Sequence, residues 1–488
     1  MNEMSVQGFY TSKPDSLSIM KKDILEGKNE TSRTQDLDRF GLYQMMMYAI
    51  LSIPLLFSAG FALLYVFTAG EVKYRCLVPE CENSSDTVFS PPWILDSAPK
   101  IDGTLATCTR YAVKENPGTC SSVSFKNITQ NCNAWFYDPN ERTILNEWDF
   151  TCDNNRWRLT LVGTINNVGQ LVGLIFAGYI SDKYGRRTIL TGATFISGIS
   201  GAGIYSAGFI LGMELTGAKN RVLGNTITNC MFALGEIILG LIAMWLRSWR
   251  TLLRVVYGPA LLAIFLPHTI PESVRWLMAN GKSEEVERVY RKMAEMNGLE
   301  VSDETIRIFK ELNVLEPANK EQSDQKTNEK GPIKQVLHSS IIMIRLLICS
   351  FCWLTNTFIY YGLSLNSVAF AGDKYVNFIL VAVVEIPAHF LTWLLTDYIG
   401  RKATLSGSFI FSGLFCLAIQ FLPSGGWLYT PLILYMGGKW CITMSFSTVY
   451  LYTAEMFPTN LRHSLLGICS MTGRIGSILA PQTPLLVS

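Results

Sequence analysis

Long apolar runs separated by short polar turns dominate the chain, and this pattern predicts membrane-spanning helices. A helix needs ~20 apolar residues to cross ~30 Å of hydrocarbon. Ten runs approach or exceed this length, five on each side of a polar central region: 42–68, 159–180, 188–213, 222–246 and 252–270, then 341–363, 375–395, 403–422, 428–453 and 464–487. We therefore predict an all-α membrane protein built from two helical halves.

The polar segments between these runs divide the chain into regions. The first forty residues are polar and include six cations, so we expect a cytosolic tail and a first apolar run that stays as an anchor. The expected divisions are a cytosolic tail at 1–40, an N-terminal membrane half at 41–270 with an extracellular loop at 70–157, an intracellular loop at 271–339, and a C-terminal membrane half at 340–488.

Two short charged turns repeat a single pattern, Asp-x-x-Gly followed by two cations. The first contains Asp182, Gly185, Arg186 and Arg187, and the second contains Asp397, Gly400 and Arg401. Glycine permits the tight turn, and paired cations favour the cytoplasmic side of a membrane. In each half a Glu is then followed seven positions later by an Arg, as Glu214–Arg221 and Glu455–Arg462. The shared order predicts two like-built halves related by an axis normal to the membrane.

The two halves nevertheless differ in length between these motifs. Asp397 and Glu455 are 58 positions apart, whereas Asp182 and Glu214 are only 32 positions apart. After Arg462 only 26 residues remain, enough for one span. We expect five spans in each half, with 188–213 entering the membrane without crossing it cleanly, so that later motifs keep the basic-inside orientation.

Composition excludes several classes of protein. Charged residues make up 16% of the 488 positions and mean hydropathy is +0.23, whereas soluble domains contain ~25% charged residues. This argues against a soluble globular protein. The formal net charge of +2 gives no indication of a nucleic-acid partner. The four histidines lack metal-ligand spacing, and no phosphate-binding Gly-Lys-Ser/Thr loop or Gly-x-Ser-x-Gly turn occurs. We therefore expect no enzyme, cofactor or metal.

Half of the twelve cysteines lie in the polar loop that follows the first apolar run. An even set within one loop predicts disulfides and an oxidising compartment, with 15 connectivities open. These disulfide candidates are Cys76, Cys81, Cys108, Cys120, Cys132 and Cys152. The loop also carries two Asn-x-Ser/Thr acceptors, at Asn83 and Asn127, which we expect to be glycosylated on the extracellular side.

Several local motifs together resemble a known family. They are FGLYQ from Phe40, EWDFTC from Glu147, DKYGRR, PESVRWL from Pro271, YYGLSLN from Tyr360, EIPAHF from Glu385, and AEMFPTNLR followed by GRIGSILAPQ. With these motifs the chain is similar to the solute carrier 22 family of the major facilitator superfamily, the organic cation and anion transporters, and most similar to invertebrate organic cation transporter-like members. The resemblance implies two pseudo-symmetric halves of six helices, alternating access and a plasma-membrane location.

Ionisable residues within apolar runs are the candidate substrate-binding groups, because each costs ~2.5–3.5 kcal/mol to insert. By resemblance, Glu385 attracts cationic substrates, whereas Arg474 stands where anion and carnitine-type members carry Arg. An Arg fork suits a carboxylate. The alternatives are a structural ion pair for Glu385, and for Arg474 a pair with Glu236 or Glu385. His389, one helical turn after Glu385, faces the same side, and it could equally be a bland pore-lining residue.

The remaining candidates are weighed in the same way. Glu236 is expected to pair with a cation from another helix, and Lys439 either pairs similarly or meets an anion. By resemblance, Tyr360 and Tyr361 line the central cavity, where aromatic faces hold organic cations by cation–π attraction; packing is the alternative for one of them. Asn229 and Phe446 are further candidates by resemblance. The residues of the repeated motifs are expected to act in gating and structure, not in substrate binding.

Three functional hypotheses follow from the sequence. The first is a plasma-membrane transporter of a small organic cation or a carnitine-like zwitterion, working within the lipid bilayer by alternating access. The second, motivated by the missing spans, is a shortened, non-transporting form that regulates a full-length partner. The third, a receptor, gives no reason for the paired basic turns.

Overall fold

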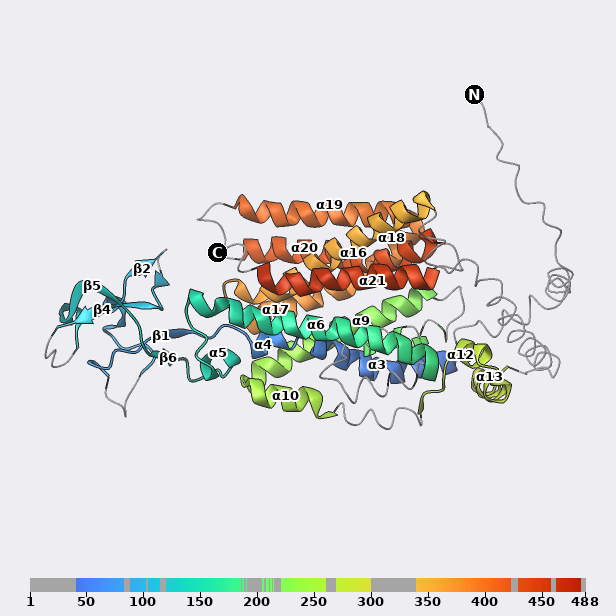
Figure 1. The fold of residues 1–488 in the computed structure, drawn as a ribbon, viewed down its shortest axis with the longest axis horizontal. Coiled ribbons are helices and arrows are strands. Elements are labelled where there is room, and N and C mark those ends of the chain that lie inside the picture. Colours follow the sequence, from blue (N-terminus) through green and yellow to red (C-terminus); the bar gives the residue numbers. More distant parts are fainter. Residues whose placement is uncertain are drawn as a thin grey trace, which may run out of the picture.

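A computed structural model of the chain shows a bundle of long helices with a small β-rich domain at one end and two short helices at the other (Figure 1). It describes residues 41–82, 88–101, 104–114, 120–185, 187, 190, 204–205, 208–209, 211–212, 214, 221–259, 269–299, 339–422, 429–457 and 462–483. Six helices within these ranges are long and apolar enough to cross a membrane.

Within the described residues, the first half contains three long helices. The first expected span consists of two consecutive helices, and Pro54 lies inside the first of them. The helices of this half are α3 (Leu42–Leu63), α4 (Tyr65–Thr68), α6 (Asp153–Tyr184), α9 (Arg221–Leu246) and α10 (Trp249–Tyr257). Most of the expected span at 188–213 and part of that at 252–270 lie outside the described residues, so the count of five spans per half stays a prediction.

The second half contains helices over all five expected spans, with one break. Its elements are α16 (Ser340–Asn366), η5 (Ser367–Ala369), α17 (Lys374–Val383), α18 (Glu385–Tyr398), α19 (Arg401–Gln420), α20 (Thr430–Met456), α21 (Arg462–Leu479) and η6 (Ala480–Gln482). The span that the sequence predicted at 375–395 is confirmed, because Lys374–Tyr398 is long and apolar enough to cross a membrane. It is divided into α17 and α18 at Val384. Pro387 has no N–H to donate to the carbonyl of Val383, so the helical ladder is weakened there.

The loop at 70–157, which the sequence predicts to be extracellular, forms a small domain with three two-stranded antiparallel sheets among its described residues. Its strands are β1 (Tyr74–Cys76), β2 (Lys100–Ile101), β3 (Thr104–Leu105), β4 (Thr109–Val113), β5 (Phe125–Asn131) and β6 (Trp135–Tyr137), paired as β1–β6, β2–β3 and β4–β5. The short helical segments are η1 (Ile94–Asp96), η2 (Ser122–Ser124) and α5 (Ile144–Glu147). Such short sheets bury little apolar surface, so they need other restraints.

Disulfides supply that restraint. All six predicted cysteines are paired, as Cys76–Cys132, Cys81–Cys120 and Cys108–Cys152, which selects one of the connectivities that the sequence left open. The last bond ties the domain to the residue immediately before α6. Asn127 is exposed on β5, and Asn83 lies outside the described residues, so glycosylation of both stays a prediction.

At the opposite end of the bundle, α12 (Val274–Ala279) and α13 (Ser283–Asn297) cover the start of α3 (Figure 1). The Asn297 side chain accepts a hydrogen bond from the Tyr43 amide at 3.0 Å. Tyr43, Met47 and Met293 form a small apolar cluster between α3 and α13. The predicted intracellular loop therefore lies at the end of the bundle away from the disulfide-bonded domain.

Candidate substrate cavity

A cavity lies between the two halves of the bundle. Helices α3, α6 and α9 of the first half and α16, α18, α20 and α21 of the second contribute side chains to it. The main apolar core also joins the halves, because it contains buried residues from α3, α9, α16, α17 and α20. A cavity bounded by both halves is the arrangement that rocking of one half against the other can expose to either side.

Aromatic rings make up much of the cavity wall. The rings are those of Tyr205, Phe232, Trp353, Tyr360, Tyr361, Phe446 and Tyr450. Several touch one another: the ring centroids of Trp353 and Tyr450 are 4.4 Å apart, and those of Tyr360 and Phe446 are 4.8 Å apart. Electron-rich ring faces of this kind attract organic cations that have little hydration to lose.

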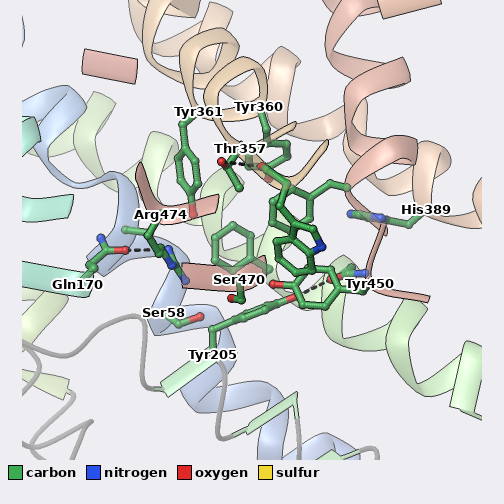
Figure 2. A pocket seen from close by; sticks show the side chains of 15 residues that line it. Ser58, Gln170, Tyr205, Thr357, Tyr360, Tyr361, His389, Tyr450, Ser470 and Arg474 are labelled. Atoms are coloured by element: carbon green, nitrogen blue, oxygen red, sulfur yellow. Dashed lines mark hydrogen bonds between the residues drawn. The ribbon is translucent and has the colours of Figure 1, made fainter. Parts of the chain in front are cut away.

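Arg474 places a guanidinium group in the cavity wall. Its Nη1 donates to the Gln170 side-chain oxygen at 3.3 Å, across the boundary between the halves. His389 lies on the far side of the cavity from Arg474 (Figure 2), and its Nδ1 is 2.8 Å from the Ser447 hydroxyl. One bond leaves most of the five guanidinium donors of Arg474 for a ligand.

A group of buried charges lies directly behind Tyr360. The Nζ atom of Lys439 is 2.8 Å from Oε1 of Glu385, and their side chains are 0% and 1% exposed. The same ammonium lies 3.3 Å from the centroid of the Tyr360 ring and donates to the Ser364 hydroxyl at 2.6 Å. Close contact with a counter-charge offsets part of the cost of removing both groups from water.

The Tyr360 hydroxyl connects this pair to a second acid. It lies 2.7 Å from Oε2 of Glu385 and 3.3 Å from Oε1 of Glu236, which is 1% exposed. Glu236 is therefore connected to Lys439 through Tyr360 and Glu385, and not by a direct bond. Glu385 begins α18 at the helix break, where the backbone irregularity positions its carboxylate between α16, α20 and α9.

Comparison with known proteins extends the sequence resemblance to most of the chain. The pattern of the sugar (and other) transporter family matches residues 116–224 and 213–486. The rat organic cation/carnitine transporter 2 is 32% identical over 489 residues, which cover 92% of this chain and 85% of that protein. The Drosophila melanogaster organic cation transporter protein is 30% identical, with the same two coverages. The chain belongs to the solute carrier 22 family.

Solved structures agree with the fold of this solute carrier 22 protein. The E. coli xylose transporter XylE, in a partially occluded inward-open conformation, aligns with a TM-score of 0.52 over 90% of each chain at 16% identity. The same transporter bound to a bromodeoxyglucose aligns with a TM-score of 0.50. These comparisons confirm the major facilitator fold, a multi-pass membrane location and membership of a transporter family rather than an enzyme family.

The cavity contains six of the eight residues that the sequence singled out for substrate binding: Asn229, Tyr360, Tyr361, His389, Phe446 and Arg474. The other two, Glu385 and Lys439, pair with each other behind the wall instead of lining it. The sequence proposed Glu385 or Glu236 as a partner for Arg474. In the structure, the Arg474 side chain instead donates a hydrogen bond to Gln170.

Sequence reasoning missed several wall residues, and four of them are Gln170, Tyr205, Trp353 and Tyr450. Two of them had a detectable signal. Trp353 precedes Tyr360 by two helical turns, and Tyr450 follows Phe446 by one turn, so both share a helix face with residues already identified. Gln170 and Tyr205 had no such sequence signal. A single polar side chain in a membrane helix is commonly explained by a hydrogen bond to the backbone of its own helix.

The first repeated turn is held by the PESVRWL motif, to which the sequence assigned no partner. Gly185 has a φ of +103°, and a Cβ there would lie 2.1 Å from the Glu272 carboxylate. That carboxylate accepts from the Arg187 amide at 3.1 Å, and the neighbouring Ser273 hydroxyl bonds to Glu214. Glycine is therefore required for both the turn and the close approach.

The second turn uses a different contact. Gly400 has a φ of +89°, and Arg401 donates to Glu455 at 3.1 Å, so that Glu455 joins the two motifs of this half. The sequence had paired each Glu with the Arg seven residues later. The side chains of Asp182, Arg221 and Arg462, and all of Arg186, lie outside the described residues, and those pairs stay predictions. So does the gating role of Asp397.

Among the described residues, no group of three or more His, Cys, Asp or Glu side chains is arranged to hold a metal ion.

Proposed function

We propose that this chain carries small organic zwitterions of the carnitine type across the plasma membrane by alternating access. The observation that carries the proposal is the pairing, within one cavity between the halves, of an Arg474 guanidinium with an extensive aromatic wall. A carboxylate and a quaternary or protonated amine on one small molecule match these two features. Two of the relatives described above are named as transporters of organic cations, and one of these also as a carnitine transporter.

The carboxylate end is assigned to Arg474. Its single bond to a neutral amide leaves it able to form the bidentate contact that guanidinium groups make with carboxylates. Charge-assisted bonds of this type contribute about 1.5–3 kcal/mol, which corresponds to about ten- to a hundredfold in affinity.

The cationic end is assigned to the rings around Tyr360, Phe446 and Tyr450. The centroids of Phe446 and Tyr450 are 5.7 Å apart, so the three rings form a continuous surface. Cation–π contacts at desolvated sites contribute about 2 kcal/mol. Glu385 lies behind Tyr360 and adds a negative charge on the same side, partly offset by Lys439.

A purely anionic substrate is the second candidate. The described cavity wall contains the formal charge of Arg474 but no ionised carboxylate, because Glu385 and its partner lie behind it. This alternative predicts binding that depends on Arg474 without any contribution from a cationic group.

Equilibrium binding to the purified protein separates these candidates. Radiolabelled L-carnitine, tetraethylammonium and a carboxylate without an amine are compared on wild type, Arg474→Ala and the exposed control Arg345→Ala. We expect Arg474→Ala to weaken the binding of L-carnitine at least tenfold and to leave the binding of tetraethylammonium unchanged. Arg345→Ala should bind both ligands as the wild type does. Unaltered L-carnitine binding in Arg474→Ala, together with its loss in Glu385→Ala, contradicts the proposal. A preference for the amine-free carboxylate supports the anion candidate instead.

A further inference from the structure

We propose that Glu236 is a proton-binding site, which holds a proton in the arrangement observed and releases it when an organic cation occupies the cavity. The first half of this proposal rests on the charge cluster alone. The second half rests on the function proposed above, because it couples the proton to the bound organic ion.

The charges in the cluster do not balance if both acids are ionised. Glu236 and Glu385 are each 1% exposed, and Lys439 is 0% exposed. Two carboxylates and one ammonium leave one negative charge without a counter-charge, shut away from water. Burial of an unpaired charge costs several kcal/mol, and a carboxyl group avoids that cost by taking up a proton.

Counting hydrogens at Tyr360 points to the same conclusion. Its hydroxyl has one hydrogen but lies within bonding distance of both acids, 2.7 Å from Glu385 and 3.3 Å from Glu236. The Tyr360 hydroxyl donates this hydrogen to the nearer acid, Glu385. The other carboxylate oxygen of Glu385 faces Lys439. The contact between the Tyr360 hydroxyl and Glu236 becomes favourable when Glu236 itself carries a hydrogen and donates it to the phenol oxygen.

The other titratable groups around Glu236 do not provide the missing charge. Lys439 on α20 is already engaged by Glu385 and Ser364. His389 on α18 directs its Nδ1 to Ser447. Neither the thiol of Cys230 nor the phenol of Tyr361 can carry a positive charge. Arg474 bonds Gln170 from α21, away from Tyr360.

Tyr360 lies between the cavity and the two acids. Its ring forms part of the cavity wall, while its hydroxyl contacts Glu385 and Glu236. An organic cation held against this ring supplies the positive charge that the cluster lacks. The O–H bond of Glu236 then breaks, its electron pair stays on the carboxylate, and the proton leaves through the cavity, so total charge is conserved.

Infrared difference spectroscopy tests the resting proton without any substrate. The wild type is expected to show the carbonyl stretch of a protonated carboxylic acid in a buried setting. That band should be absent from Glu236→Gln, which resembles the protonated acid in shape, and should shift in Tyr360→Phe, which removes the bonded hydroxyl. Control variant His389→Gln should retain it. A wild-type spectrum without such a band, or a band that survives in Glu236→Gln, overturns the proposal. If Glu236→Gln does not fold, the Tyr360→Phe shift decides.

Calorimetry in buffers of different ionisation enthalpy tests the coupling. We expect release of about one proton per tetraethylammonium bound by wild type, and none by Glu236→Gln. Binding should weaken about tenfold for each unit of acidification below the release point. Tetraethylammonium binding with no proton released, or binding that depends on sodium instead of pH, contradicts the coupling. Failure of tetraethylammonium to bind at all, with the infrared band present, contradicts the coupling but leaves the proton site standing. Binding of L-carnitine then tests the transport function separately.

Discussion

At the scale of single residues, Lys439 is held by several partners at once. It is completely buried and contacts an acid, a hydroxyl and an aromatic ring at once. Removing one partner of a buried pair strands the other charge, whereas removing both together can be nearly neutral. The pair therefore offers a direct test of whether the cluster stabilises the fold or serves the cavity.

We predict that Lys439→Met destabilises the protein by about 3–5 kcal/mol, because it leaves Glu385 buried without its cation. The double variant Lys439→Met/Glu385→Gln should recover most of that loss. Thermal unfolding in detergent measures both. Equal destabilisation of the single and double variants would contradict the pairing.

The sequence was informative about which residues matter here and uninformative about their contacts. Glu236, Glu385 and Lys439 are recognisable because a charge within an apolar run requires a partner. Which partner each takes depends on how four separate helices are rotated and packed, and no local pattern encodes that. The same reason explains why Gln170 could not be anticipated as the neighbour of Arg474.

At the scale of helices, close packing between α16 and α21 forms one wall of the cavity. Gly473 and Gly476 of α21 lie against Trp353, Leu354 and Thr357 of α16. A Cβ at Gly476 would lie 2.3 Å from the Leu354 carbonyl oxygen, which is backbone and cannot rotate away. Small residues allow such approach in membrane bundles, where apolar burial provides no driving force between helices.

Gly476→Ala is therefore expected to separate α21 from α16 and to cost about 1–3 kcal/mol through overpacking. Gly467→Ala is the matched control, because the same helix has open space at that position. Unfolding temperature of the two variants provides the comparison. Gly467→Ala should be neutral or slightly stabilising, and equal losses in both would show that the helix contact is not the cause.

Helix positions were largely predictable from apolar runs, whereas two kinds of irregularity were not. The break at Val384 depends on Pro387, which lies inside a run that is apolar enough for one continuous span. The disulfide connectivity was also undetermined, because spacing cannot rank 15 alternatives. The pairing Cys108–Cys152 joins segments that only the folded domain brings together.

At the scale of the whole molecule, several contacts join the halves at the end that carries the disulfide-bonded domain. Lys374, at the start of α17, bonds to Glu141 of that domain, and Tyr375 stacks on Phe67 at 5.4 Å. Gln482 donates to Thr164 of α6 at 2.6 Å. These contacts favour a conformation closed at this end, which the sequence predicts to be extracellular, and opening it requires breaking them.

We predict that Lys374→Ala shifts the protein toward an outward-open conformation. The Lys374–Glu141 pair is partly buried, so its loss should change the equilibrium by about 0.5–1 kcal/mol, or about two- to fivefold. A Ser470→Cys reporter in the cavity wall, labelled from outside by an impermeant thiol reagent, measures the change.

The control for that experiment is Arg250→Ala. Arg250 bonds to Glu147, so it lies in the same extracellular region but connects two segments of the first half. Its loss should leave the labelling rate unchanged. Equal acceleration by both variants would indicate general loosening of the domain and not an interaction between the halves.

We expect this chain by itself to move small organic ions through the cavity between its two helical halves. The most direct test is counterflow of radiolabelled L-carnitine in sealed liposomes that contain only the purified protein, preloaded with unlabelled L-carnitine. We expect the wild-type protein to give saturable, transient accumulation of label. The accumulation should be strongly reduced in Arg474→Ala and retained in Arg345→Ala. Folded wild-type protein that gives no accumulation of L-carnitine, tetraethylammonium or an organic carboxylate would contradict the claim and favour a non-transporting, regulatory form.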